Sequence, residues 1–102
     1  MDLSALPAEL QQAARVDANG EVSWPDEDAA KAIESLTTVG HRVLGLDVRF
    51  YLADGTFYEI PWSSSHADPG EAQADALDAL SRIDELERPE DAVERRVLVT
   101  WE

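Results

Sequence analysis

The chain of 102 residues carries 22 acidic and 8 basic residues, has a formal net charge of −14 and contains no cysteine. This length predicts a single domain, residues 1–102. The acid excess disfavours direct binding to nucleic acid or to anionic membranes, because both require clustered lysine and arginine. The absence of cysteine excludes disulfides and thiolate metal sites.

The N-terminus, MDLSALPAEL, has neither the basic segment nor the long apolar run of a signal peptide. Apolar runs elsewhere in the chain fall far short of the ~18–20 residues that a membrane-spanning helix needs. We therefore expect, by default, a cytoplasmic protein.

An amphipathic helix is predicted from about Ser4 or Pro7 to Val16, because serine caps helices and proline is tolerated in a first turn. Its apolar stripe has helical spacing and consists of Leu3, Leu6, Leu10 and Ala13 or Ala14. The turn formers of residues 17–20 end this helix, and residues 21–24 are a short strand candidate.

A second helix is predicted from Asp26 to about Val39. Ser23 and Asp26 have the spacing of a capping box, and Asp26 is alternatively the cap itself. The predicted buried face consists of Ala29, Ile33, Leu36 and Val39. Gly40 follows at the position where a left-handed residue ends many helices.

The stretch from Arg42 to Trp62 predicts a β-hairpin that turns at Asp54-Gly55. A two-residue turn would place polar side chains opposite apolar ones on both faces of the hairpin. A three-residue loop, residues 53–55, sorts the side chains cleanly, so we predict this register. It pairs Leu52 with Thr56 and creates an apolar face with the pairs Phe50–Tyr58, Val48–Ile60 and Leu46–Trp62.

The second face of the hairpin carries the pairs Tyr51–Phe57, Arg49–Glu59 and Asp47–Pro61. If helices cover only the apolar face, these side chains point to solvent. Exposed aromatic residues among charges are typical of protein interfaces. The alternative is an aromatic pair that only stabilises the hairpin, or one that the N-terminal helix covers.

A third helix is predicted from about Pro69 to Leu86, capped by Asp68 or Ser65. Its polar face carries Asp75 and Asp78. Residues 95–101 form the last strand, whose apolar side chains alternate.

The fold class is therefore α+β: an N-terminal helix followed by β-α-β-β-α-β, with a mainly antiparallel sheet of three to four strands and helices on one face. This is the connectivity of a ferredoxin-like fold, in which the first strand would be central. In the alternative arrangement the first strand lies at an edge, and the third helix connects two parallel strands. The expected sheet core is Leu44, Leu46, Val48, Phe50, Tyr58, Ile60, Trp62, Val97, Val99 and Trp101.

These features predict a small acidic protein-binding module with no enzymatic activity, cofactor or metal. Its partner would be a basic protein, because opposite charge steers association. The most concrete form is an immunity or inhibitor protein that neutralises a basic toxin or nuclease. Another is a DNA-mimicking surface that occupies a nucleic-acid-binding protein. The predicted partner-binding residues are Asp47, Arg49, Tyr51, Phe57, Glu59, Asp75 and Asp78.

Two other function classes stay open. One is a small-molecule-binding or enzymatic domain that would use His66, Asp68 and Asp47. The other is a structural subunit, a homodimer whose hairpin or last strand pairs with its own copy across a two-fold axis.

Overall fold

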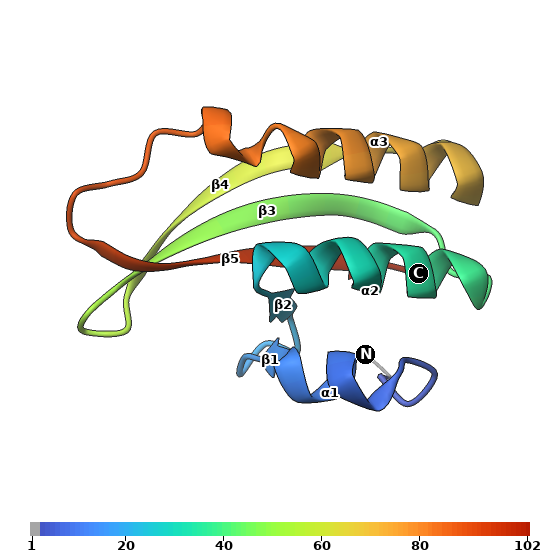
Figure 1. The fold of residues 1–102 in the computed structure, drawn as a ribbon, viewed down its shortest axis with the longest axis horizontal. Coiled ribbons are helices and arrows are strands. Elements are labelled where there is room, and N and C mark those ends of the chain that lie inside the picture. The colour runs from blue at the N-terminus through green and yellow to red at the C-terminus, as the bar shows by residue number, and fades with distance from the viewer. Residues whose placement is uncertain (1–2) are drawn as a thin grey trace.

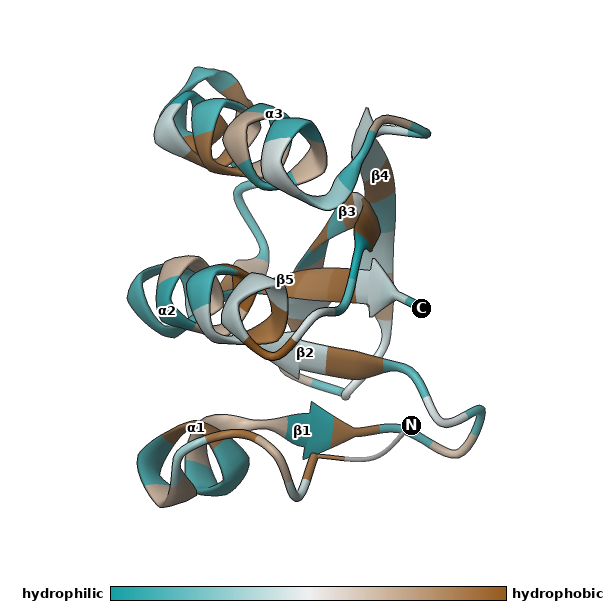
Figure 2. Cartoon of the chain, turned by 90° about the vertical axis from the view of Figure 1, so that its right-hand side faces the viewer, coloured by the Kyte–Doolittle hydropathy of each residue, from teal (hydrophilic) through white to brown (hydrophobic). Residues whose placement is uncertain are grey.

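A computed structural model describes residues 3–102 of the chain. Helices cover one face of a five-stranded antiparallel sheet, an α+β fold (Figure 1, Figure 2). The strands are β1 (Arg15–Val16), β2 (Val22–Trp24), β3 (Val43–Leu52), β4 (Phe57–Ser64) and β5 (Ala92–Trp101). The helices are α1 (Ala8–Ala13), α2 (Asp26–Thr38), α3 (Pro69–Ser81) and the short 3-10 helix η1 (Ile83–Glu85). None of the helices in these residues is long and apolar enough to cross a membrane.

The strands lie in the order β1-β2-β5-β3-β4. β2 and β3 are therefore parallel with β5 between them, and β4 and β5 are parallel with β3 between them. The predicted α+β class is confirmed, but the central first strand of a ferredoxin-like sheet is not observed. β2 has only 3 residues, whereas β3 and β5 have 10 each and pair along most of their length. The longest strands thus take the central positions, and the short β2 lies near an edge.

The N-terminal helix is shorter than predicted, because α1 ends at Ala13 and Arg15–Val16 forms strand β1. This strand pairs with β2 and adds a fifth strand to the expected sheet. Asp17 closes the hairpin between them, since its Oδ1 accepts hydrogen bonds from the backbone N–H groups of Asn19 (2.9 Å) and Glu21 (3.0 Å). A carboxylate that satisfies two turn donors favours the hairpin over another helical turn.

Helix α2 ends at Thr38, and Gly40 takes the predicted left-handed position after it, with φ +96°. The N–H of Gly40 donates to the Thr37 carbonyl and that of His41 to the Leu36 carbonyl, the pattern of a Schellman motif. The helix start differs from the prediction, because no side chain caps it and Asp26 pairs with Arg95 instead. Val39 lies beyond the last helical residue and is exposed, so its predicted burial is wrong.

The predicted hairpin register is confirmed from Asp47 to Tyr51. Gly55 has φ +88°, and the N–H of Leu52 donates to the Thr56 carbonyl at 2.8 Å. Beyond Asp47 a β-bulge adds Trp62 to β4, so Leu46 lies opposite Ser63 and the predicted Leu46–Trp62 pair is wrong. The bulge leaves the indole on the helix-covered face, where Trp62 Nε1 donates to the Ala79 carbonyl of α3 at 2.6 Å.

Helix α3 begins as predicted, with Asp68 Oδ1 accepting from the Glu71 N–H at 3.0 Å and Pro69 as the first residue. Its stripe of small residues packs on the sheet, and the predicted core is largely confirmed. Two members of that prediction are wrong. Leu44 is only half-buried, because the β3–β5 register shifts beside it. Tyr58 is exposed, because the end of the β3–β4 hairpin extends beyond the helices (Figure 1).

Candidate functional site: the open face of the sheet

The sheet face opposite the helices is here called the open face (Figure 2). The strand registers place polar side chains of β3, β4 and β5 on it. The alternation of side chains along a strand places there Asp47, Arg49, Tyr51, Phe57, Glu59, Glu94, Arg96 and Leu98. All five residues predicted for this face therefore lie together. Their surroundings differ from the prediction, because some of them bind other parts of the chain.

Arg49 is only 3% exposed, so the prediction that it faces solvent is wrong. Its Nε donates to Glu59 Oε1 at 2.6 Å, Nη1 to Asp17 Oδ2 at 3.1 Å and Nη2 to Glu21 Oε1 at 3.3 Å. Burial lowers the pKa of Arg49, but the hydrogen bonds to Glu59, Tyr51 and Asp17 outweigh it and raise the pKa overall. Only the Glu59 pair followed from the sequence; the other carboxylates come from the β1–β2 turn.

Arg96 lies directly opposite Arg49 across the β3–β5 ladder and is also buried. Its guanidinium points the other way, toward β2. It donates to Ser23 Oγ at 3.0 Å, to the Ser23 carbonyl at 2.8 Å and to the Ala13 carbonyl at 2.9 Å. Burial lowers the pKa of Arg96. Arg49 and Arg96 therefore both bind the N-terminal segment to the sheet, and neither of them is a free cation.

The aromatic pair of the open face is half covered. Tyr51 and Phe57 have ring centroids 5.2 Å apart, and Arg49 Cζ lies 4.3 Å from the Phe57 ring centroid. Arg15 Cζ lies 5.4 Å from the Tyr51 ring centroid. Tyr51 is half-buried under these contacts, but Phe57 remains 42% exposed. The pair stabilises the hairpin and still presents an aromatic surface to solvent.

Asp47 differs from its neighbours because its carboxylate has no hydrogen bond or ion pair within residues 3–102. It lies opposite Pro61 in β4 and opposite the buried Leu98 in β5. Burial raises the pKa of Asp47, and the negative charges of Glu59 and Glu21 raise it further. The positive charge of Arg49 opposes this rise only in part. The open face thus holds a partly desolvated carboxylate without a direct ion-pair partner among the described residues.

The structure separates Asp75 and Asp78 from the other predicted partner-binding residues. Both are exposed residues of α3, which packs on the opposite face of the sheet. Asp75 Oδ2 accepts from Ser65 Oγ at 3.0 Å, and Asp78 Oδ2 lies 3.3 Å from Arg82 Nη2, an i, i+4 pair. A single flat partner on the open face cannot contact these two carboxylates.

The residues considered for an enzymatic site do not converge. Asp68 caps α3, and Asp47 lies on the open face. His66 is exposed, and its backbone carbonyl accepts from Arg42 at 3.2 Å. Across residues 3–102 there is no group of three or more acidic and histidine side chains placed to hold a metal ion.

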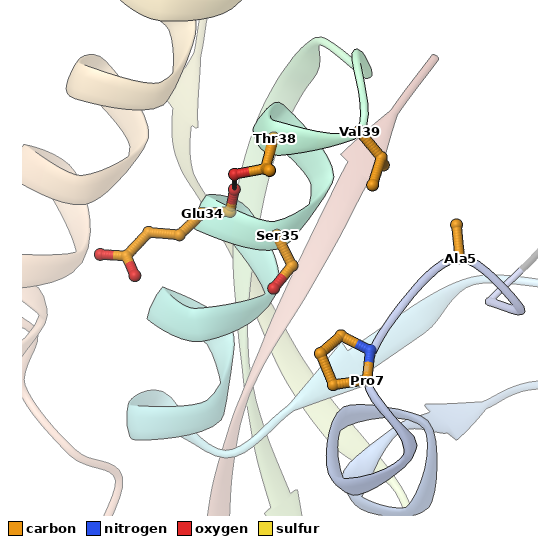
Figure 3. Close-up of a pocket in the computed structure, with 6 residues that line it drawn as sticks. All are labelled: Ala5, Pro7, Glu34, Ser35, Thr38 and Val39. Atoms are coloured by element: carbon orange, nitrogen blue, oxygen red, sulfur yellow. Dashed lines mark hydrogen bonds between the residues drawn. The ribbon is translucent and has the colours of Figure 1, made fainter.

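A groove of about 390 Å³ lies between the segment before α1 and the C-terminal half of α2 (Figure 3). Its lining is Ala5, Pro7, Glu34, Ser35, Thr38 and Val39. The Thr38 hydroxyl is already used, because it donates to the Glu34 carbonyl at 2.9 Å. The polar groups of the groove are thus one carboxylate, Glu34, and two hydroxyls, Ser35 and Thr38.

The open face is a stronger candidate for a binding site than the groove beside α2, because it carries an exposed aromatic ring, Phe57, and a carboxylate without an ion-pair partner in the described part of the chain, Asp47. Comparison with protein-family models, with curated proteins and with solved structures finds no match for this chain.

Proposed function

We propose that this chain is a small acidic protein-binding module that holds a basic protein on its open face. The observation that carries the proposal is that an exposed ring, Phe57, and a carboxylate without an ion-pair partner in residues 3–102, Asp47, lie on the same face of the sheet. The described helices all lie on the other face. Aromatic residues are enriched at the energetic centres of interfaces. A half-buried carboxylate gains stabilisation when a partner supplies a cation.

Charge defines the class of partner. Arg49 is surrounded by the carboxylates of Asp17, Glu21 and Glu59, and Arg15 pairs with Glu94 at 2.8 Å. The cations near the open face are thus neutralised internally, while the chain keeps a net charge of −14. A positively charged surface fits this face, and long-range attraction increases its association rate.

The most concrete form of the proposal is an immunity or inhibitor protein that covers the functional surface of a basic toxin or nuclease. Its acidic side chains would take the place of nucleic acid phosphates on that surface. The acidic face of α3, with Asp75 and Asp78, is a second contact region in this proposal only if the partner reaches around the sheet.

The proposal is tested by capturing partners on the immobilised chain and measuring the dissociation constant of each purified partner by calorimetry. Asp47→Asn is expected to weaken binding about tenfold, as typical for the loss of one interfacial charge pair. Asp75→Asn/Asp78→Asn removes twice the charge from the opposite layer and serves as the matched control. Affinity should also fall steeply from ~0.1 M to ~1 M salt, where the screening length drops from ~10 Å to ~3 Å. Equal effects of the two variants, or salt-independent binding, would reject the open face as the interface.

A further inference from the structure

The end of the β3–β4 hairpin forms an arm, residues 51–58, that extends beyond the helices (Figure 1). Every residue from 53 to 59 is exposed. On its inner side the arm is supported by the start of β5, where Tyr51 pairs with Glu94 and Leu52 with Ala92. The arm is therefore accessible from both faces of the sheet and along the outer edge of β4.

The arm is exposed but well ordered by hydrogen bonds. Asp54 Oδ1 accepts from the Thr56 N–H at 3.0 Å and from the Thr56 hydroxyl at 2.6 Å. These two bonds lower the pKa of Asp54, so its carboxylate stays ionised. The Gly55 N–H donates to the Leu52 carbonyl at 3.0 Å and closes the turn. A preorganised loop loses little conformational entropy when it binds.

Two adjacent aromatic residues of the arm point in opposite directions. Phe57 lies opposite Tyr51 on the open face and is 42% exposed. Tyr58 lies opposite Phe50 on the helix-covered face, beyond the reach of the helices, and is 49% exposed. A flat partner on the open face would bury Phe57 and leave Tyr58 in water. A cleft with two walls would bury both rings.

The arm and the chain beside it carry four carboxylates. Asp54 and Glu59 belong to the arm and its continuation, and Glu90 and Asp91 precede Ala92, the partner of Leu52. All four are exposed. Two cations lie near the arm: Arg88 donates to the Ala92 carbonyl at 3.3 Å, and Arg49 Cζ lies 4.3 Å from the Phe57 ring centroid. The charge of Arg49 is already balanced by Asp17, Glu21 and Glu59. The surroundings of the rings are therefore negative, which complements a positively charged cleft.

We propose that this arm inserts into a positively charged cleft of the protein partner, with Phe57 against one wall and Tyr58 against the other. The inference rests on the proposed function and specifies the shape of the partner. Insertion explains why both rings are exposed on a rigid, acidic projection, whereas docking on the open face alone gives Tyr58 no role. A groove that binds nucleic acid has the required charge and depth.

The experiment uses the photo-crosslinking amino acid p-benzoylphenylalanine, placed in the full chain at position 57, at position 58 or, as a control, at the exposed Val16 of β1. Crosslinked peptides are mapped by mass spectrometry. Insertion predicts that positions 57 and 58 capture the same basic protein at residues on opposite walls of one cleft. Position 16 should capture much less of it.

The purified partner is then titrated with variants that remove one ring each. Phe57→Ala and Tyr58→Ala should each weaken binding at least about tenfold, as expected for central aromatic contacts, and Val16→Ala less than about twofold. The melting temperatures of Tyr58→Ala and Val16→Ala should stay close to that of the unmodified chain, because these side chains are exposed. Phe57→Ala should lower it by a few degrees, because the ring also contacts Tyr51 and Arg49, so binding is measured well below the melting temperature of each variant. If position 58 and Tyr58→Ala have no effect while position 57 does, insertion is wrong and open-face docking stands. If neither position crosslinks and neither variant weakens binding, both proposals are wrong.

Discussion

Arg49 joins three segments of the chain through one side chain. Its guanidinium binds Glu59 of the neighbouring strand and, from the β1–β2 turn, Asp17 and Glu21. The burial of this group depends on all three carboxylates, because an unpaired buried guanidinium would be strongly destabilising. Arg49, which the sequence predicts as a partner-binding residue, is thus a buried structural contact of the open face.

Replacing Arg49 tests this role. Arg49→Met should lower the free energy of unfolding by about 2–4 kcal/mol, because it removes a buried ion-pair partner and leaves three neighbouring carboxylates without a cation. Urea titration measures the change. Arg82→Gln is the control, since its pairs with Asp78 and Glu85 are exposed and worth about 0–1 kcal/mol. Similar losses in the two variants would contradict a structural role specific to Arg49.

Arg49 stabilises the folded chain, whereas Asp47 should lower its stability and contribute to partner binding. Its raised pKa means that the folded state favours the protonated form, so its contribution to stability is present at acidic pH and is lost as pH rises through the folded pKa. Asp47→Asn is therefore expected to be more stable than the unmodified chain at neutral pH, by about 0.3–0.8 kcal/mol after screening by solvent. The gain should disappear below about pH 4, where an ordinary aspartate is also protonated. Chemical denaturation across this pH range measures it, and a variant less stable at neutral pH would contradict the assigned environment.

The β3–β4 hairpin shows what sequence reasoning captures at the scale of an element. Its register from Asp47 to Tyr51 could be predicted because a one-residue slip would exchange every apolar and polar side chain between the faces. The bulge at Trp62 could not, because it depends on the indole reaching the Ala79 carbonyl of a distant helix. The aromatic pair was predicted, but the carboxylates that bury Arg49 were not, because they come from a turn 28 and 32 residues away.

The outer edge of β4 carries a feature that limits self-association. Along β4, residues whose backbone groups bond to β3 alternate with residues whose backbone groups face the free edge. Because Leu52–Thr56 is a hydrogen-bonded pair, this alternation turns the nitrogen of Pro61 toward the free edge. Proline has no N–H there, so it interrupts the row of donors that a second copy of the chain would need.

Pro61→Val restores the missing donor on this edge. It is expected to shift concentrated protein toward a dimer, because two β4 edges could then pair along their length. Sedimentation velocity compares the variant with the unmodified chain at equal concentration. Identical sedimentation coefficients would show that Pro61 does not protect the edge.

At the scale of the whole molecule, strand order was the feature least accessible from sequence. The pattern of helices and strands is shared by several sheet orders, and residues such as Ser23 gave no sign that β2 would pair with β5. The fifth strand was missed because the two residues of β1 continue a helical apolar pattern. The observed order places the two longest strands, β3 and β5, side by side, and they pair along most of their length.

The net charge should also affect stability as a whole. Six arginines are paired with carboxylates in the described residues, and many acidic side chains remain without a cation. Their mutual repulsion is screened by salt. The melting temperature is therefore expected to rise by several degrees between ~0.05 M and ~0.5 M sodium chloride, on the usual scale for ~1 kcal/mol in a domain of this size. A fall in melting temperature would mean that the ion pairs outweigh the repulsion.

The most direct test of the proposed interface is amide hydrogen exchange of the chain alone and in complex with its captured partner. The N–H groups of Phe57 and Glu59 face the free edge of β4, so they should exchange rapidly in the free chain. We predict that the partner slows exchange in residues 57–61 and leaves α3 unchanged. Protection confined to α3, around Asp75 and Asp78, would contradict the open face as the binding surface.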